Sequence, residues 1–181
     1  MLLSHPPQGD GWVSAERELL IAVQTADCIP LLLVDPKQRV VAAVHAGWRG
    51  TLQRIGAKAV RMMQTAFGSD PCNLLAVVGP AIRSCCYEVG EEVVEAFRKE
   101  FEHSAGFFCP PPKDKATRVD SLCIDLVEVC RRQLLDAGVM TGDIFTDGPC
   151  TACEKDRFFS HRSDSISGGR MMSVIGIVEA E

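Results

Sequence analysis

The chain has 181 residues, 46% of them hydrophobic and 24% charged, which is the composition of an ordinary globular protein with a buried core. Its net charge of −5 excludes the basic face that non-specific binding to nucleic acid or to an anionic membrane requires. No stretch approaches the ~20 continuous apolar residues of a membrane span, and the opening MLLSHPPQGDG lacks the pattern of a secretory signal. We therefore expect one domain over residues 1–181, located in the cytoplasm, with neither nucleic acid nor a membrane as partner. The oligomeric state is left open.

The first half of the chain has the pattern of strands followed by a helix. Residues 19–34 are apolar on both sides of the polar triplet TAD, which predicts two short strands. After the turn DPKQR, residues 40–45 predict the next strand. Apolar residues then recur at three- and four-residue steps over 52–67, which indicates an amphipathic helix that ends at Gly68.

The second half alternates strand and helix patterns. Residues 73–80 predict a buried strand and 90–101 a helix, followed by a turn-rich excursion over 104–118. Helical spacing resumes over 120–138, and 170–178 predicts a closing strand. Strands in mixed order with helices between some of them predict a layered α/β fold, whose strand order the periodicity does not determine.

Two chemically reactive side chains stand at the ends of apolar strands. Cys28 follows the polar triplet that ends in Asp27, and His45 ends the run VVAAVH. If the two strands are neighbours, thiol and imidazole meet at the rim of a sheet, where sites in α/β folds tend to lie. Both are zinc ligands, although each could equally be a buried packing residue or a histidine held by a backbone hydrogen bond.

The residues after His45 favour a ligand site. Gly47 and Gly50 permit close backbone approach, and Arg49 adds a forked cation at the start of the predicted helix. Phosphate and carboxylate are the ligands expected to bind such a group. The alternative is that Arg49 forms a structural ion pair.

The segment GPAIRSCCYEVGEEV at 79–93 places two adjacent cysteines in a turn. Cys85 and Cys86 precede Tyr87 and Glu88. Adjacent cysteines rarely form a disulfide with each other, so thiol packing or reactivity is expected. Glu88 could act as an acid or base, or could simply favour the start of the next helix.

Nine cysteines are many for a chain of this length, but their number is odd and their spacing irregular, which indicates reduced thiols. Cys150 and Cys153 form a C-x2-C pair with His161 eight residues beyond. No second C-x2-C completes a four-ligand zinc site, and the surroundings do not match a thioredoxin-like motif. The pattern therefore favours thiols without a metal.

Taken in order, TADCIPLLL, VAAVHAGWRGT, GPAIRSCCYEVG and CTACEKDRFFSHRSD followed by GRMMSVIG resemble the YfiH-type family. It is also called the laccase-domain or multicopper polyphenol oxidoreductase family, and more recently the purine nucleoside phosphorylases. The resemblance extends from about residue 10 to residue 178. It implies an α/β/β/α layered sandwich with mixed sheets.

The resemblance also implies a metal, usually zinc, held by two histidines and a cysteine, with copper as the other candidate. The matching motifs assign the cysteine to Cys28 and one histidine to His45. The family's other histidine lies in a QVHG motif upstream of TADC, and this chain contains no such motif. His5 stands in SHPP and lies too close to Cys28 in the sequence to match. We thus expect a domain that is short at its N-terminus relative to the family, with weakened metal binding.

The activity implied by the resemblance is phosphorolysis of adenosine, inosine or methylthioadenosine, with adenosine deamination at the same site. Cys28, His45 and Arg49 are the expected catalytic residues. A nucleoside and phosphate are the expected small-molecule partners, and the candidates for contacting them are Asp27, Arg49, Cys86 and Glu88. Asp27 or Glu88 could handle the proton on the departing base.

Three alternatives accompany this interpretation. Cys28 could be a nucleophile activated by His45, as in a hydrolase or an amidase that edits peptidoglycan precursors. A copper-dependent polyphenol oxidase would need several coppers and many histidines, whereas this chain has four scattered ones. The chain could also bind nucleosides without catalysis.

Overall fold

The computed structural model describes residues 8–116, 120–163 and 168–179. A five-stranded sheet in the order β1-β4-β3-β5-β9 forms its centre. Neighbouring strands in this sheet are antiparallel, except that β5 and β9 are parallel. Its strands are β1 (Gly11–Ser14), β3 (Ile29–Asp35), β4 (Val40–Ala46), β5 (Leu75–Val78) and β9 (Ile144–Phe145).

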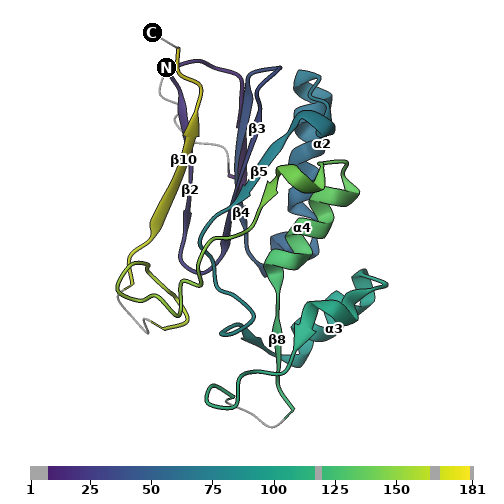
Figure 1. Ribbon diagram of the computed structural model, residues 1–181, viewed down its shortest axis with the longest axis vertical. Coiled ribbons are helices and arrows are strands. Elements are labelled where there is room, and N and C mark those ends of the chain that lie inside the picture. Colours follow the sequence, from purple (N-terminus) through teal and green to yellow (C-terminus); the bar gives the residue numbers. More distant parts are fainter. Residues whose placement is uncertain (1–7, 117–119, 164–167, 180–181) are drawn as a thin grey trace.

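A second sheet pairs β2 (Leu20–Thr25) with β10 (Met171–Gly176) and packs against one face of the central sheet (Figure 1). Helices α2 (Ile55–Phe67) and α4 (Leu126–Asp136) cover the opposite face. Strand β4 is buried on both sides, because alternate residues along a strand point to opposite faces and each face meets another layer. Val44 faces the helices and Val41 faces the second sheet. The described residues thus form three layers, helices on a sheet on a sheet.

Three short strands and helix α3 form a smaller unit at one end of the molecule, where α3 and β8 lie below the helical layer in Figure 1. A three-stranded sheet in the order β6-β8-β7 packs there with helix α3, and Phe97 stacks on Phe101. These elements are β6 (Glu88–Val89), α3 (Glu91–Glu100), β7 (Phe108–Cys109) and β8 (Leu122–Ile124). Short 3₁₀ helices occupy Pro71–Asn73 (η1), Ser104–Phe107 (η2) and Thr141–Asp143 (η3).

The strands predicted on either side of the polar triplet, at 40–45 and at the C-terminus are confirmed, and so is the helix at 90–101. The predicted strand at 73–80 is confirmed in its central part, as β5. The predicted α/β class is also confirmed, but in the described residues no helix covers the outer face of β2 and β10. The fourth layer of the expected sandwich is therefore not shown.

Two predicted helices are wrong at their starts. The helix predicted over 52–67 is divided into α1 (Trp48–Leu52) and α2, because Arg54 adopts a left-handed conformation with φ 61°. Arg54 pairs with Glu100 at 3.0 Å and stacks on an aromatic ring of the smaller unit, so tertiary contacts hold this break.

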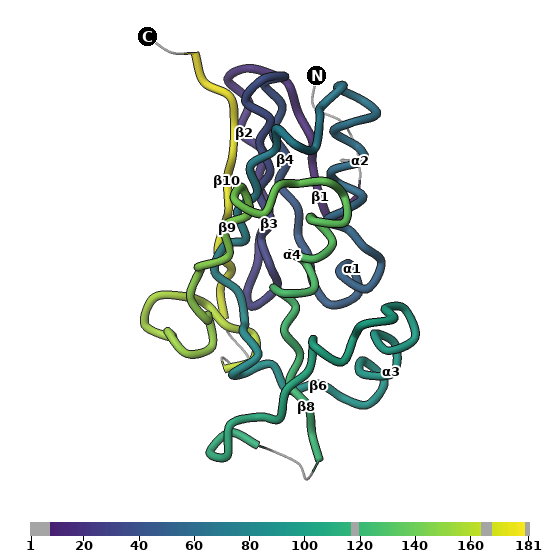
Figure 2. The backbone as a smooth tube through the Cα atoms, turned by 45° about the vertical axis from the view of Figure 1, so that its right-hand side comes forward, coloured from purple at the N-terminus to yellow at the C-terminus, as the bar shows by residue number. Residues whose placement is uncertain are grey.

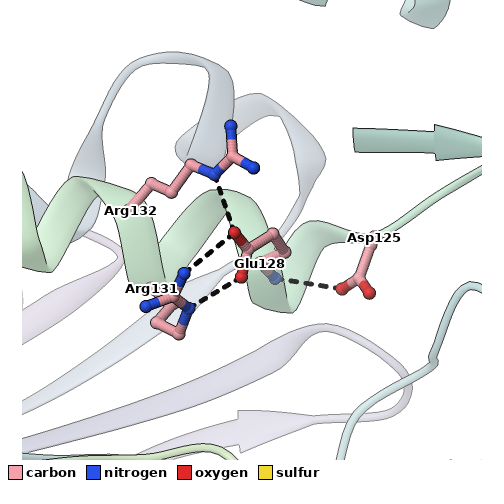
Figure 3. A network of polar contacts seen from close by, with 4 residues as sticks. All are labelled: Asp125, Glu128, Arg131 and Arg132. Atoms are coloured by element: carbon pink, nitrogen blue, oxygen red, sulfur yellow. Dashed lines mark hydrogen bonds and ion pairs between the residues drawn. The ribbon is translucent and has the colours of Figure 1, made fainter. Parts of the chain in front are cut away.

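The helix predicted over 120–138 begins only at Leu126, since residues 122–124 form β8. Asp125 caps the helix by accepting a hydrogen bond from the Glu128 amide at 3.0 Å. Figure 3 shows this cap together with the ion pairs that Glu128 makes with Arg131 and Arg132, both at 2.7 Å. None of the helices in the described ranges is long and apolar enough to cross a membrane.

Candidate functional site

Strand pairing brings Cys28 and His45 to the same end of the central sheet, at the ends of two neighbouring strands. Strands β3 and β4 are antiparallel, with Pro30 opposite His45, so the start of one strand lies beside the end of the other. A Cβ atom on Gly47 would lie 3.2 Å from Cys28 Sγ and 3.8 Å from His45 Nε2. The predicted convergence of sulfur and imidazole is therefore present, and the absent side chain of Gly47 leaves the space between them.

The imidazole of His45 is held from both sides. Its Nδ1 lies 3.1 Å from Asp10 Oδ1, and its backbone amide donates to the Asp10 carbonyl at 2.7 Å. The hydrogen bond with Cys28 raises the pKa of His45 to about 9, with a smaller contribution from Asp10 and against the effect of burial. Asp10 thus orients the ring through Nδ1 and leaves Nε2 on the side of Gly47, where Cys28 Sγ also lies, which is how a third group orients a catalytic base or a metal ligand.

An open cavity of about 260 Å³ adjoins this pair. Arg49 is exposed at its rim and stacks on the Trp48 ring with 4.3 Å between the guanidinium carbon and the ring centroid. Stacking restrains a long, mobile side chain and leaves the N–H fork available to an anion. The cavity is lined by Asp10, Cys28, His45, Gly47, Trp48, Arg49 and Gly50.

Asp27 is buried next to this cavity but does not line it. Its carboxylate accepts hydrogen bonds from the Thr151 hydroxyl at 2.6 Å and from the Arg162 amide at 2.7 Å. Its backbone has φ 84°, a conformation that non-glycine residues rarely adopt. Both carboxylate oxygens are thus engaged in joining the turn before Cys28 to the loop over 146–163.

Tyr87 lies near the site without lining the cavity, and the sequence analysis did not single it out. It is the single tyrosine of the chain, and it lies near enough to Cys28, Asp27 and Arg49 for their charges to act on its hydroxyl. Burial raises its pKa to about 12, so the phenol stays protonated. Arg162 packs over its ring at 5.3 Å. Its position just after the vicinal cysteines was the available signal.

The other two predicted site residues lie elsewhere. Cys86 and the buried Glu88 line a second cavity of about 420 Å³, together with Lys115 and Arg162. The candidate residues thus divide into two neighbouring groups, with Tyr87 and Asp27 between them. His103 and His161 are exposed, and His5 lies outside the described residues.

Four thiols gather beside the second cavity. The ligand atoms of Cys85, Cys86, Cys150 and Cys153 all lie within 4.8 Å of one another, and this is the one group of three or more close-set ligand residues among the described ranges. The expectation that the C-x2-C pair lacks two further cysteines is wrong, because the vicinal pair supplies them. This donor set could hold a metal ion.

Two of the four thiols have pKa values shifted in opposite directions. Burial, followed by hydrogen bonds with the neighbouring thiols, raises the pKa of Cys85. A hydrogen bond from Cys86 lowers the pKa of the exposed Cys153. Four sulfur atoms this close cannot all be anions unless a cation lies among them.

The chain is similar to known proteins over most of its length. The profile of the multi-copper polyphenol oxidoreductase laccase family matches residues 3–178. Purine nucleoside phosphorylase YlmD of Bacillus subtilis is 37% identical over 174 residues, which are 94% of this chain and 59% of that protein. Adenosine deaminase RL5, from an unknown prokaryotic organism, is 40% identical over 167 residues, or 92% and 61% of the two chains.

The fold agrees as well. The crystal structure of YlmD from Geobacillus stearothermophilus superposes with a TM-score of 0.86 at 37% identity, covering 96% of this chain and 62% of that one. The chain therefore spans about three fifths of the length of the curated relatives it matches.

Proposed function

Because this chain belongs to the multi-copper polyphenol oxidoreductase laccase family, we propose that it takes part in purine nucleoside chemistry at the Cys28–His45 cavity. The reaction is phosphorolysis of adenosine, inosine or methylthioadenosine, with adenosine deamination at the same site. The observation that carries the proposal is the convergence of Cys28, His45 and Arg49 on one open cavity, in a chain 37% identical to a purine nucleoside phosphorylase.

Zinc is the proposed cofactor of this cavity, and the donors fit it. A thiol and an imidazole nitrogen are preferred zinc ligands, and Asp10 supports the histidine in the manner usual for a metal-bound ring. Cys28 and His45 would hold the ion, with further ligands from water, substrate or another segment. When bound, zinc would supply a Lewis acid that polarises an oxygen atom.

Side chains of the protein would bind the phosphate and transfer the proton. Arg49 would hold phosphate against the anomeric carbon of the nucleoside while positive charge develops on the sugar. The phosphate oxygen forms the new bond to that carbon, the C–N bond breaks, and the base leaves with the electron pair and takes up a proton. The predicted proton handlers, Asp27 and Glu88, do not line the cavity. The protonated Tyr87 hydroxyl is a third candidate, which also does not line the cavity but lies near enough to Cys28 for the charge of the thiolate to act on it.

The test is phosphate-dependent cleavage of adenosine, followed as adenine and ribose 1-phosphate. Cys28→Ala and His45→Ala should each lower turnover by at least ~100-fold, the scale of losing one group that acts in the transition state. Cys72→Ala, an exposed cysteine of η1, is the matched control. Equal turnover in all of these variants would reject the site.

A second function is favoured by one observation, the position of Cys28 beside a histidine that Asp10 orients. The same three groups form the nucleophile, base and orienting acid of a cysteine hydrolase or amidase. An electrophilic thiol label that attaches first at Cys28, with chelators leaving activity unchanged, would favour this function over the zinc enzyme.

The four-layer α/β/β/α arrangement and a cytoplasmic location are also part of the proposal. On the outer face of β2 and β10, Leu20, Met172 and Val174 are exposed to 65%, 60% and 42%. A helical layer over this face would bury them. Nine free thiols suit a reducing compartment.

A further inference from the structure

Four cysteines from two separate segments form a compact cluster. Cys85 and Cys86 lie in the turn between β5 and β6, and Cys150 and Cys153 lie in the loop after β9. Figure 2 shows this loop, in light green, beside the teal segment that follows β5. A parallel bridge between Ala81 and Cys150 joins the two segments at the cluster.

Three of the four sulfur atoms are spaced as the corners of a zinc tetrahedron would be, and Cys150 Sγ lies within 4.8 Å of each of them. Cys86 Sγ lies 3.4 Å from Cys153 Sγ, and Cys85 Sγ lies 3.7 Å from Cys153 Sγ and 3.9 Å from Cys86 Sγ. Zinc–sulfur bonds of ~2.3 Å in tetrahedral geometry require sulfur atoms about 3.8 Å apart. A shift of a few tenths of an ångström would bring these three to that spacing, and Cys150 would need to move by about 1 Å at most.

The surroundings of the sulfur atoms suit thiolates. The Arg83 amide donates to Cys150 Sγ at 3.4 Å, and the Lys115 ammonium donates to Cys86 Sγ at 3.2 Å and to Cys153 Sγ at 3.5 Å. Donors of this kind stabilise metal-bound sulfur and offset the negative charge that four thiolates leave around a divalent ion. An apolar packing cluster would gain nothing from an ammonium group.

We propose that Cys85, Cys86, Cys150 and Cys153 together bind one zinc ion in a closed, tetrahedral site. Four soft thiolates favour zinc over magnesium, calcium and manganese, which prefer oxygen ligands. Four protein ligands leave no position for water or substrate, so the ion stabilises the fold and takes no part in the reaction. Binding releases the thiol protons to solvent.

The position of the cluster indicates what the ion stabilises. The loop that carries Cys150 also carries Thr151, whose hydroxyl holds the carboxylate of Asp27, the neighbour of Cys28. The turn that carries Cys86 leads directly into Tyr87. Zinc would thus hold together two segments, one that binds the Asp27 carboxylate and one that leads into Tyr87, which backbone hydrogen bonds already join through Ala81.

Disulfide formation is the rival for the same four thiols. The sulfur atoms are 3.4 Å apart or more in the pairs given above, well beyond the ~2.05 Å of a bond. Three mutually close sulfurs also leave no unique pair. A disulfide among these thiols is therefore one of the results that the test below can detect.

The test measures zinc per chain in the double variant Cys28→Ser, His45→Ala, which removes the other candidate metal site. Purified under reducing conditions, this protein should hold about one zinc per chain. Adding Cys150→Ser or Cys86→Ser should lower that content at least tenfold, while adding Cys72→Ser should leave it unchanged. Because Cys28 and His45 are absent, the result does not depend on the proposed reaction.

A second measurement covers variants that fail to fold. Cobalt(II) exchanged into the unmutated cluster of the same double variant should give the strong sulfur-to-metal absorption of a tetrathiolate site. Zinc content that is unaffected by the cluster cysteines, weak cobalt absorption, or a disulfide among the four found by mass spectrometry of the reduced preparation would each overturn the proposal.

Discussion

Replacing Gly47 by alanine tests the Cys28–His45 cavity with the smallest possible change. The new methyl carbon would lie 3.2 Å from Cys28 Sγ and 3.6 Å from His45 Cε1. Gly47 has φ −73° and ψ 174°, an extended conformation that alanine adopts without strain. The substitution therefore acts on the site and hardly on the backbone.

The expected magnitudes follow from these distances. Since unstrained contacts of this kind lie at roughly 3.5–4.0 Å, Cys28 Sγ must retreat by about 0.5 Å. A misplacement of about 1 Å can cost ~100-fold in rate, so half of that distance should lower turnover by about 10-fold. Stability should change by less than ~1 kcal/mol, because local crowding is offset by the lower entropy of the unfolded chain.

The assay compares initial rates of phosphate-dependent adenosine cleavage with urea unfolding of the same preparations. Gly142→Ala in η3 is the matched control, because a Cβ there meets nothing within 4 Å and no left-handed backbone is involved. Full turnover in Gly47→Ala would refute the reasoning that reaction takes place between Cys28 and His45. A loss of turnover matched by unfolding would refute the claim that the change is local.

Three further variants test the surrounding structure. Thr151→Val removes the hydroxyl donor to Asp27 and should lower the free energy of unfolding by ~1–3 kcal/mol in urea, whereas Thr151→Ser should not. Hydrogen bonds from arginines hold the pKa of Glu128 below its usual 4.5, so its stabilisation is complete above that value and is lost as the pH falls through the folded-state pKa. Glu128→Gln should therefore be ~0.5–1 kcal/mol less stable than the parent at neutral pH and equal to it in strong acid, and a constant difference in urea midpoints would contradict this (Figure 3). Gly148→Ala would place its Cβ 2.8 Å from the carbonyl carbon of Gly79 and should cost at least ~2 kcal/mol and lower the zinc content, so an unchanged melting temperature would show that the two segments do not touch.

The two candidate metal sites differ in what they allow an ion to do. Cys28 and His45 offer two ligands at an open cavity, which leaves coordination positions for water or substrate. The four-cysteine cluster offers a complete set and leaves none. Chelation should therefore affect them separately, with the cavity losing its ion first and the cluster retaining it longest.

Much of the central fold was determined by the sequence alone. The strands over 29–35 and 40–46 follow from continuous apolar runs broken by a polar turn, because a strand covered on both faces needs apolar residues at nearly every position. The strand over 20–25 instead alternates buried and more exposed residues, as a strand with one covered face does. The family was also readable from TADC and HAGWRG, and the profile match confirms it. The convergence of Cys28 and His45 needed only that the two strands be neighbours.

Other features were decided by tertiary contacts. At the break between α1 and α2, Arg54 pairs with Glu100 from a different helix, and residues 122–124 form a strand because partners on both sides pair with them. A helical pattern reports burial along one segment and cannot reveal such partners.

The four-cysteine cluster is the clearest case of this limit. Ligand spacing within one segment reveals only half of the set, because Cys85 and Cys153 are 68 residues apart in the chain and 3.7 Å apart in space. Local sequence determines which residues are buried and which turns form. Which thiols meet depends on how the segment after β5 packs against the loop after β9, and only the folded chain decides that.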